Sequence, residues 1–164
     1  MSLLHIYDAS DFRIRLMARS RGTTTLKVTS FTDLLTSLNA QVAAGARFER
    51  ILFETHGSPG RIYFDDDGVS ASTLRSMIPL GYNRLTTPSA RVYFNGCNVA
   101  AESAGWSFLD AAVELFLTPG GGEVFGQTSL GIGNPFNGHV VHLWGETRRL
   151  FVDSTGRIVE RFEQ

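Results

Sequence analysis

Two short apolar runs, each followed by a glycine motif, constrain the fold of this chain most. Residues 51–53 (Ile-Leu-Phe) lead into a His56-Gly57 pair, and residues 92–94 (Val-Tyr-Phe) lead into a Gly96-Cys97 pair. Short apolar runs bounded by glycine are typical of strands buried in a parallel sheet. Because the carboxyl ends of parallel strands meet at one edge of the sheet, we expect His56 and Cys97 to be neighbours although they are 41 positions apart.

The remaining pattern alternates between strands and helices. We expect a three-layer α/β sandwich with a mainly parallel central sheet. Thr86 to Ser89 and Gly131 to Pro135 read as loops, Asp67-Gly68 as a hairpin turn and Ser72 as a helix cap. The expected strands are 3–7, 12–16, 24–29, 48–53, 61–64, 90–94 and 123–126, the expected helices are 30–45, 72–77 and 104–117, and 139–144, 148–152 and 157–162 form a C-terminal β-hairpin region.

Length and composition indicate a single globular domain over residues 1–164. Hydrophobic residues make up 43% of the chain and charged residues 19%, and the net charge of -1 gives no overall field that favours nucleic acid or an anionic membrane. The four arginines at positions 13, 15, 19 and 21 are interpreted as a solvated face. With no signal-peptide pattern, no apolar run near the ~20 residues of a membrane span and one cysteine, we expect a cytoplasmic location. The oligomeric state is left open.

The two motifs carry the groups that nucleophilic catalysis by a thiol requires. Cys97 is the candidate nucleophile and His56 the candidate general base. Gly57 and Gly96 let the backbone turn and a substrate approach, and the amides of Gly57 and Cys97 are candidate donors to an oxyanion. The alternative is structural: free cysteine is often a small buried hydrophobe, and a loop histidine often bonds locally. Four residues beside the motifs are candidates for the substrate pocket: Glu54, Ser58, Asn95 and Asn98.

A strand followed by His-Gly and a second strand followed by Gly-Cys resembles the caspase-like cysteine peptidases, which include caspases, metacaspases, legumains, gingipains and clostripains. Residues 56–60 (His-Gly-Ser-Pro-Gly) and 96–100 (Gly-Cys-Asn-Val-Ala) are most similar to a bacterial caspase-like domain of unknown function. The resemblance implies a caspase-like fold, with His56 as general base or acid, Cys97 as nucleophile and the Gly57 amide in the oxyanion site. It also implies a peptide or protein as substrate or partner, and no cofactor.

Two departures from this resemblance leave specificity open. Caspases carry Gln-Ala-Cys before the nucleophile, where this chain has Asn95-Gly96-Cys97. Relatives that cleave after basic residues often carry Asp two positions before the cysteine, where this chain has neutral Asn95. The chain also lacks the long loops that usually shape a peptidase pocket. A non-catalytic binding or scaffold domain of the same fold therefore stays an alternative to a peptidase with a His/Cys dyad.

A third interpretation is an α/β-hydrolase-like serine hydrolase, because His-Gly-Ser-Pro-Gly also resembles the oxyanion loop of that fold. That fold needs a Gly-x-Ser-x-Gly elbow, and the nearest match is 101–105 (Ala-Glu-Ser-Ala-Gly), past the strand end. No metal site is expected, because His139 and His142 point to opposite faces of a strand and the Asp65 to Gly68 segment lacks calcium-loop spacing. The glycines at 120–122 have neither the lysine nor the following helix of a phosphate loop.

Overall fold

The centre of the molecule is a β-sheet that is parallel over most of its width. The computed structural model describes residues 1–18, 24–133 and 140–164. The strands in chain order are β1 (Leu3–Asp8), β2 (Thr24–Val28), β3 (Phe48–Glu54), β4 (His56–Ser58), β5 (Arg61–Phe64), β6 (Asp67–Ser70), β7 (Thr86–Asn95), β8 (Gly122–Gln127), β9 (Leu130–Gly133), β10 (Val140–Leu143), β11 (Thr147–Val152) and β12 (Ile158–Glu163).

In the described residues, four α-helices and three shorter helical turns connect these strands. The helix that precedes β3 is capped by Ser30, whose side chain accepts a hydrogen bond from the amide of Asp33, and its C-cap, Ala44, is followed by Gly45, which has a φ of +68°. The helices are α1 (Phe12–Met17), α2 (Phe31–Ala43), α3 (Ala71–Ser76) and α4 (Glu102–Ala112), and the turns are η1 (Ile78–Leu80), η2 (Tyr82–Leu85) and a π-helical turn η3 (Val113–Leu117).

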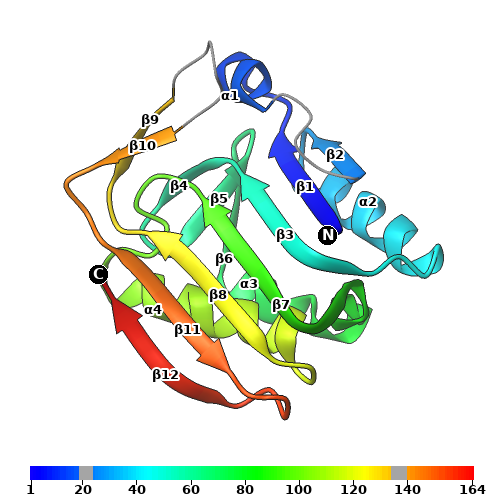
Figure 1. Cartoon of the computed structure of the whole chain (residues 1–164). Coiled ribbons are helices and arrows are strands. Elements are labelled where there is room, and N and C mark those ends of the chain that lie inside the picture. Colours follow the sequence, from blue (N-terminus) through cyan, green and yellow to red (C-terminus); the bar gives the residue numbers. More distant parts are fainter. Residues whose placement is uncertain (19–23, 134–139) are drawn as a thin grey trace.

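Seven strands form the central sheet in the order β12-β11-β8-β7-β3-β1-β2 (Figure 1). The five strands from β8 to β2 run parallel, and β11 and β12 extend the β8 edge with antiparallel pairing. This arrangement confirms the predicted α/β class and the mainly parallel central sheet. Strands β4, β5 and β6 form a separate small antiparallel sheet that directly follows β3, and β9 and β10 form a two-stranded ribbon.

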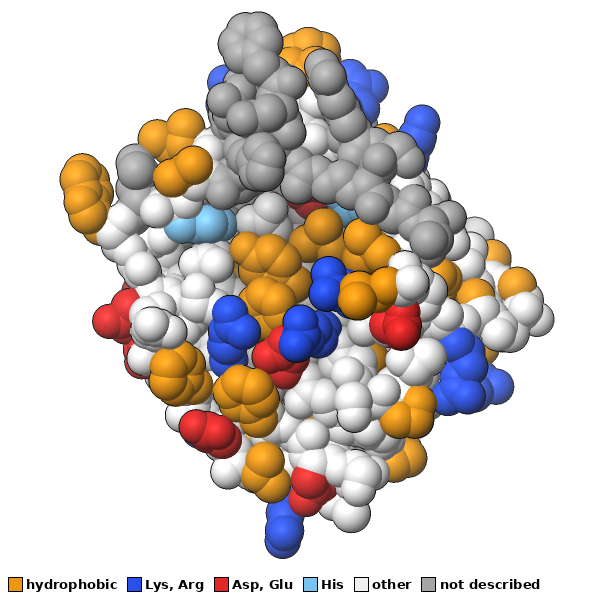
Figure 2. Space-filling model, in the orientation of Figure 1, with side chains coloured by type: hydrophobic (Ala, Val, Ile, Leu, Met, Phe, Trp, Pro, Cys, Tyr) orange, Lys and Arg blue, Asp and Glu red, His pale blue; other side chains and the backbone are white. Residues whose placement is uncertain are grey.

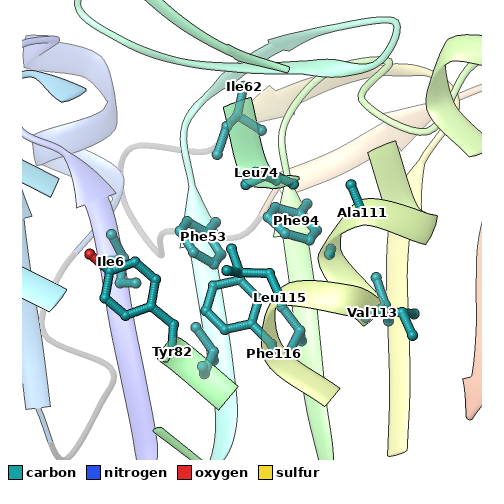
Figure 3. Packing of buried hydrophobic residues seen from close by; sticks show 14 of the residues in the cluster. Ile6, Phe53, Ile62, Leu74, Tyr82, Phe94, Ala111, Val113, Leu115 and Phe116 are labelled. Carbon is teal, nitrogen blue, oxygen red and sulfur yellow. The ribbon is translucent and has the colours of Figure 1, made fainter. Parts of the chain in front are cut away.

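Helices α2, α3 and α4 and the three turns cover one face of the sheet. Alternate strand residues such as Phe53 and Phe94 point to this face and stack at 4.8 Å between ring centroids, and Phe108 of α4 meets Phe94 edge-on. Figure 3 shows Phe53 and Phe94 beside Leu115 and Phe116 of the turn that follows α4. Because these rings are buried on a sheet held by parallel pairing, the core fixes the position of the strands that carry both glycine motifs.

The opposite face of the sheet differs from the predicted third layer. In the part of the chain that the structure describes, α1 is the helix on this face, where Ile14 packs on Tyr7 at the carboxyl end of β1. The rest of the face carries half-buried apolar side chains among arginines, seen in Figure 2. Tyr93 stacks on Phe125, and Arg149 lies over Phe125. The three-layer expectation therefore holds only at the edge where α1 packs.

Several local predictions were wrong for identifiable reasons. Residues 12–16 form α1 rather than a strand, because the side chain of Asp11 caps that segment by accepting hydrogen bonds from the amides of Arg13 and Ile14. Residues 86–89 belong to β7 and residues 131–133 to β9, although both stretches were expected to be loops. Residues 134–135 of the second loop, Arg19 and Arg21 of the basic cluster, and His139 lie outside the described residues.

The β5–β6 turn and the cap of α3 each lie two positions from where the sequence placed them. Phe64 pairs with Asp67, so the turn is formed by Asp65 and Asp66, and Asp65 has a φ of +56°. An aspartate tolerates this left-handed conformation, and the Asp65 amide is held by the side chain of Asp8. Helix α3 is capped by Ser70 through a reciprocal capping box rather than by Ser72. None of the helices described here is long and apolar enough to cross a membrane.

Candidate active site

A pocket lies where the chain reverses its direction of travel across the sheet. From β1 the chain moves outward to β2, whereas β3 and β7 follow on the other side of β1. Ligand crevices of open parallel sheets form at such a switch point, outside the carboxyl ends of the strands. The pocket has a volume of about 480 Å³, within the range of small-ligand sites. It is lined by Phe12, Arg13, Ile14, Leu16, Met17, Glu54, Thr55, His56, Asn95, Cys97, Gly131 and Ile132.

The two glycine motifs meet backbone to backbone beside this pocket. Register pairs Glu54 with Asn95, so the chain leaves both strands at the same level of the sheet. A Cβ atom placed on Gly57 would lie 2.6 Å from the carbonyl oxygen of Cys97, and the Cβ position of Gly96 lies 3.4 Å from the Cα of Gly57. Only glycine permits so close an approach of two chains. His56 and Cys97 both line this pocket.

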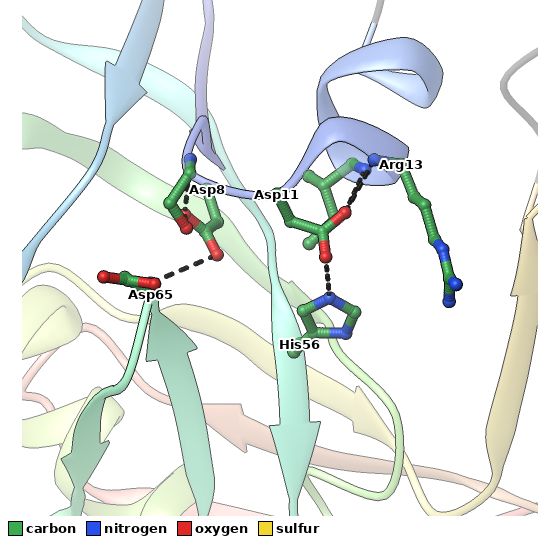
Figure 4. Close-up of polar contacts among 7 residues, drawn as sticks. Asp8, Asp11, Arg13, His56 and Asp65 are labelled. Atoms are coloured by element: carbon green, nitrogen blue, oxygen red, sulfur yellow. Dashed lines mark hydrogen bonds and ion pairs between the residues drawn. The ribbon is translucent and has the colours of Figure 1, made fainter.

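His56 is oriented by a residue that the sequence analysis did not identify. The imidazole is half-exposed on β4, and its Nε2 lies 2.9 Å from Oδ2 of Asp11 (Figure 4). The other carboxylate oxygen of Asp11 accepts from the first amides of α1. With Asp11 as acceptor, Nε2 holds the proton of the neutral ring and Nδ1 keeps a free lone pair. The pKa of Asp11 is lowered, chiefly by its hydrogen bond to His56. The hydrogen bonds from the amides of Arg13 and Ile14 lower it further.

The Cys97 sulfur is partly buried beneath β9. The amide of Gly131 donates to Sγ at 3.2 Å, and Sγ lies 3.7 Å from the Gly131 carbonyl oxygen, to which the thiol can donate. The turn after Cys97 is itself braced, because Asn98 takes a φ of +57° and its amide donates to the carbonyl of Ser129 at 2.9 Å. Cys97 thus sits on a short turn between β7 and α4, five residues before α4 begins.

Glu54 and Asn95 contribute to the lining of the pocket from the ends of β3 and β7. Oε2 of Glu54 lies 2.8 Å from Nε2 of His5, and both side chains are buried. Oδ1 of Asn95 accepts from the hydroxyl of Tyr93 and lies 3.1 Å from Nε2 of His142. Burial raises the pKa of Tyr93 and lowers the pKa of His142. The carboxyl edge of the sheet therefore holds a polar layer beside the two reactive side chains.

Two of the predicted pocket residues are placed elsewhere. Ser58 bonds to the hydroxyl of Tyr63 at 2.9 Å within the small sheet, and Asn98 stabilises the turn after Cys97. Neither contributes to the pocket lining, whereas Glu54 and Asn95 do. Gly57 and Gly96 act through close packing rather than as lining residues.

The sequence contained one signal for Asp11 that could have been found. An Asp directly before a short amphipathic segment is a typical helix N-cap, because its side chain can accept hydrogen bonds from the amides two and three residues further on. The alternation of apolar and basic residues in 12–16 favoured a strand instead, so Asp11 was not interpreted as a helix cap. The position of Asp11 next to His56 depends on β1 and β3 being neighbours, and no local pattern reports that pairing.

The alternative serine chemistry finds no matching geometry. Ser103 lies in the first turn of α4 and is exposed, away from the pocket that His56 lines. Within residues 1–18, 24–133 and 140–164, no group of three His, Cys, Asp or Glu side chains is placed to hold a metal ion.

Comparisons with known proteins give one family and one distant structural likeness. A family model described as a domain of unknown function, DUF4347, matches residues 9–118, a span that contains Asp11, His56 and Cys97. A short chain dehydrogenase family protein from Francisella tularensis subsp. tularensis SCHU S4 is 13% identical, with a TM-score of 0.34 over 66% of this chain and 57% of that one. A likeness at this level bears on neither fold nor function. No curated protein matches the chain.

Proposed function

The chain belongs to the DUF4347 family, a domain of unknown function, and we propose that it is a caspase-like cysteine peptidase that acts through Cys97, His56 and Asp11. The observation that carries the proposal is the pocket at the switch point, which is lined by both His56 and the single cysteine. A caspase-like fold, with β11 and β12 as its C-terminal hairpin, is part of the same proposal. The antiparallel strands at the β8 edge and the His-Gly and Gly-Cys strand ends support it.

Each of the three side chains has a distinct role in this proposal. Asp11 accepts a hydrogen bond from Nε2–H of His56 and positions the ring, so that Nδ1 removes the proton from the Cys97 thiol. The sulfur then attacks the carbonyl carbon of a peptide bond and forms a thioester. The amine leaves with the proton from His56, and water hydrolyses the thioester to release the acid and restore the thiol. The amides of Gly57 and Cys97 are the proposed donors to the oxyanion of each tetrahedral intermediate.

The proposal includes a reducing compartment such as the cytoplasm, because the thiol nucleophile acts only in its reduced form. It requires no cofactor. Its substrate is a peptide or protein segment that lies along the carboxyl edge of the sheet, with no role for nucleic acid or a membrane.

The single cysteine makes the central test simple, because alkylation by iodoacetamide reports on Cys97 alone. We expect folded protein at pH 7 to react, His56→Ala to react at least ~10-fold more slowly, and Asp11→Asn to fall between the two. Cys97→Ser then abolishes cleavage of a fluorogenic peptide library. A matched control is Ser103→Ala, which changes an exposed side chain of α4 outside the pocket. A Cys97 that resists alkylation in the folded state contradicts the proposal.

A non-catalytic binding domain of the same fold is the second candidate. The observation that favours it is the engagement of the Cys97 sulfur by the amide and carbonyl of Gly131, which partly covers the thiol. In that case the pocket binds a peptide without cleaving it. Peptide turnover that is lost in Cys97→Ser excludes this candidate.

A further inference from the structure

A buried carboxylate oxygen in the lining of the pocket has no hydrogen-bond partner among the described residues. Glu54 is only 2% exposed and lines the pocket from the end of β3. His5 occupies its Oε2, whereas Oε1 is left without a donor. A buried oxygen with an unmet hydrogen bond destabilises a fold, and it is usually explained by a ligand or by function.

The walls beside Glu54 are apolar and come from two sides of the pocket. Phe12, Leu16 and Met17 of α1 line one side, and Ile132 of β9 lines another. Phe12 and Ile132 are both largely exposed, at 67% and 58%, although each belongs to the pocket lining. Apolar walls around one buried acid suit a ligand with an aliphatic stem and a cationic end.

The charges around the pocket also favour a ligand with a positive charge. Arg13 also lines the pocket, but it is exposed, and in Figure 4 its side chain extends away from the carboxylate of Asp11. A charge in solvent is screened, whereas a buried charge acts through a lower dielectric. Glu54 therefore contributes more to the selection of a ligand than Arg13 does. His5 contacts the other carboxylate oxygen, Oε2, so Oε1 is left as an acceptor. The Nδ1 atom of His5 likewise has no hydrogen-bond partner among the described residues.

We propose that Glu54 is the specificity residue of the site and that the pocket binds a lysine or arginine side chain of a peptide. The ammonium or guanidinium donates to Oε1 of Glu54, and the methylene stem packs on Leu16 and Met17. This inference rests on the proposed peptidase function for the position of the scissile bond, but the binding itself needs no catalysis. It assigns the acid to the end of β3, whereas the position two residues before Cys97 is neutral Asn95.

Binding to Cys97→Ala protein tests the inference without any turnover. The probes are the Nα-acetyl amides of lysine, arginine, norleucine and aspartate, titrated against the protein by NMR. We expect the lysine and arginine amides to bind about 10-fold or more tighter than the norleucine amide, because a hydrogen bond to a charged group is worth roughly that ratio. Norleucine has the stem of lysine without its charge, so it isolates the contribution of the ammonium.

Two variants assign the preference to Glu54. Glu54→Gln in the Cys97→Ala background is expected to lose the preference for lysine over norleucine, whereas Glu160→Gln, at an exposed acid of β12 outside the pocket, is expected to keep it. Equal binding of the lysine and norleucine amides, or tighter binding of the aspartate amide, overturns the inference without reference to any variant, which matters if Glu54→Gln fails to fold beside His5. Selective binding in a protein that never cleaves a peptide refutes the peptidase proposal alone, and cleavage without a basic preference refutes this inference alone.

Discussion

The contact between Gly57 and Cys97 gives the sharpest test of how the two motifs are held together. A Cβ atom on residue 57 would lie 2.6 Å from the Cys97 carbonyl oxygen and 3.1 Å from the Cys97 amide nitrogen. Ordinary contacts begin at 3.4 Å, so the two chains must separate by about 0.8 Å. Gly57 does not have a positive φ, so Gly57→Ala acts through this collision and not through backbone strain.

The chains cannot separate freely, because both are held on either side of the contact. The pairing of β3 with β7 ends at Glu54 and Asn95, and the amide of Gly60 donates to the carbonyl of Val99 at 3.0 Å. We therefore expect Gly57→Ala to lower the free energy of unfolding by about 1–3 kcal/mol, the usual cost of overpacking. For a chain of this length that is a fall in Tm of roughly 2–12 °C. A displacement near 1 Å also slows alkylation of Cys97 if His56 assists it, by up to ~100-fold.

Urea unfolding followed by circular dichroism measures the first effect, and iodoacetamide labelling of folded protein measures the second. Gly68→Ala is the matched control, because a Cβ on that strand residue would meet only side-chain atoms of Tyr63 and Arg61, at 3.3 Å and beyond. We expect this control to stay within about 0.5 kcal/mol of the wild type. Equal stability of Gly57→Ala and Gly68→Ala would falsify the claim that the two motifs pack backbone to backbone.

Two further predictions concern stability outside the site. Arg148 donates to Glu163 and to the carbonyls of Ala100 and Glu102, and its guanidinium lies over the ring of Trp106. An ammonium group cannot make all of these contacts, so Arg148→Lys should lower the free energy of unfolding, measured with a chemical denaturant, by about 1–3 kcal/mol. The exposed Arg157→Lys serves as its control, and equal effects of the two would refute the reasoning. Burial raises the pKa of Tyr82 to about 12, so the stability it contributes is complete below its ordinary pKa near 10 and is lost as the pH rises through 12. Between pH 9 and 12 the free energy of unfolding should therefore decrease less steeply with pH for Tyr82→Phe than for the wild type. Equal slopes for the two proteins would contradict this.

The agreement between pattern and structure is best where burial and local chemistry act together. The runs 51–53 and 92–94 are strands because their apolar side chains fill the core. Ser30 caps α2, a role that the sequence left open between Ser30 and Thr32. Agreement fails at residues 12–16 and 86–89. In the first, one cap residue outweighs five residues of alternating pattern. In the second, Thr86 pairs with Phe48 of β3 and so begins β7 early, and the register shifts before pairing resumes at Arg50 and Arg91.

The sequence by itself determined that a histidine and a lone cysteine follow two buried strands, each beside glycine. This pattern predicts that the histidine and the cysteine lie at the same edge of the sheet, because parallel strands align their carboxyl ends. Tertiary structure alone decided which other groups reach that edge. Asp11 meets His56, and Glu54 meets His5, across the pairing of β1 with β3, whose partners are more than 40 positions apart along the chain. Sheet register, and not local propensity, sets such contacts, and the uneven covering of the two sheet faces likewise depends on how whole elements pack.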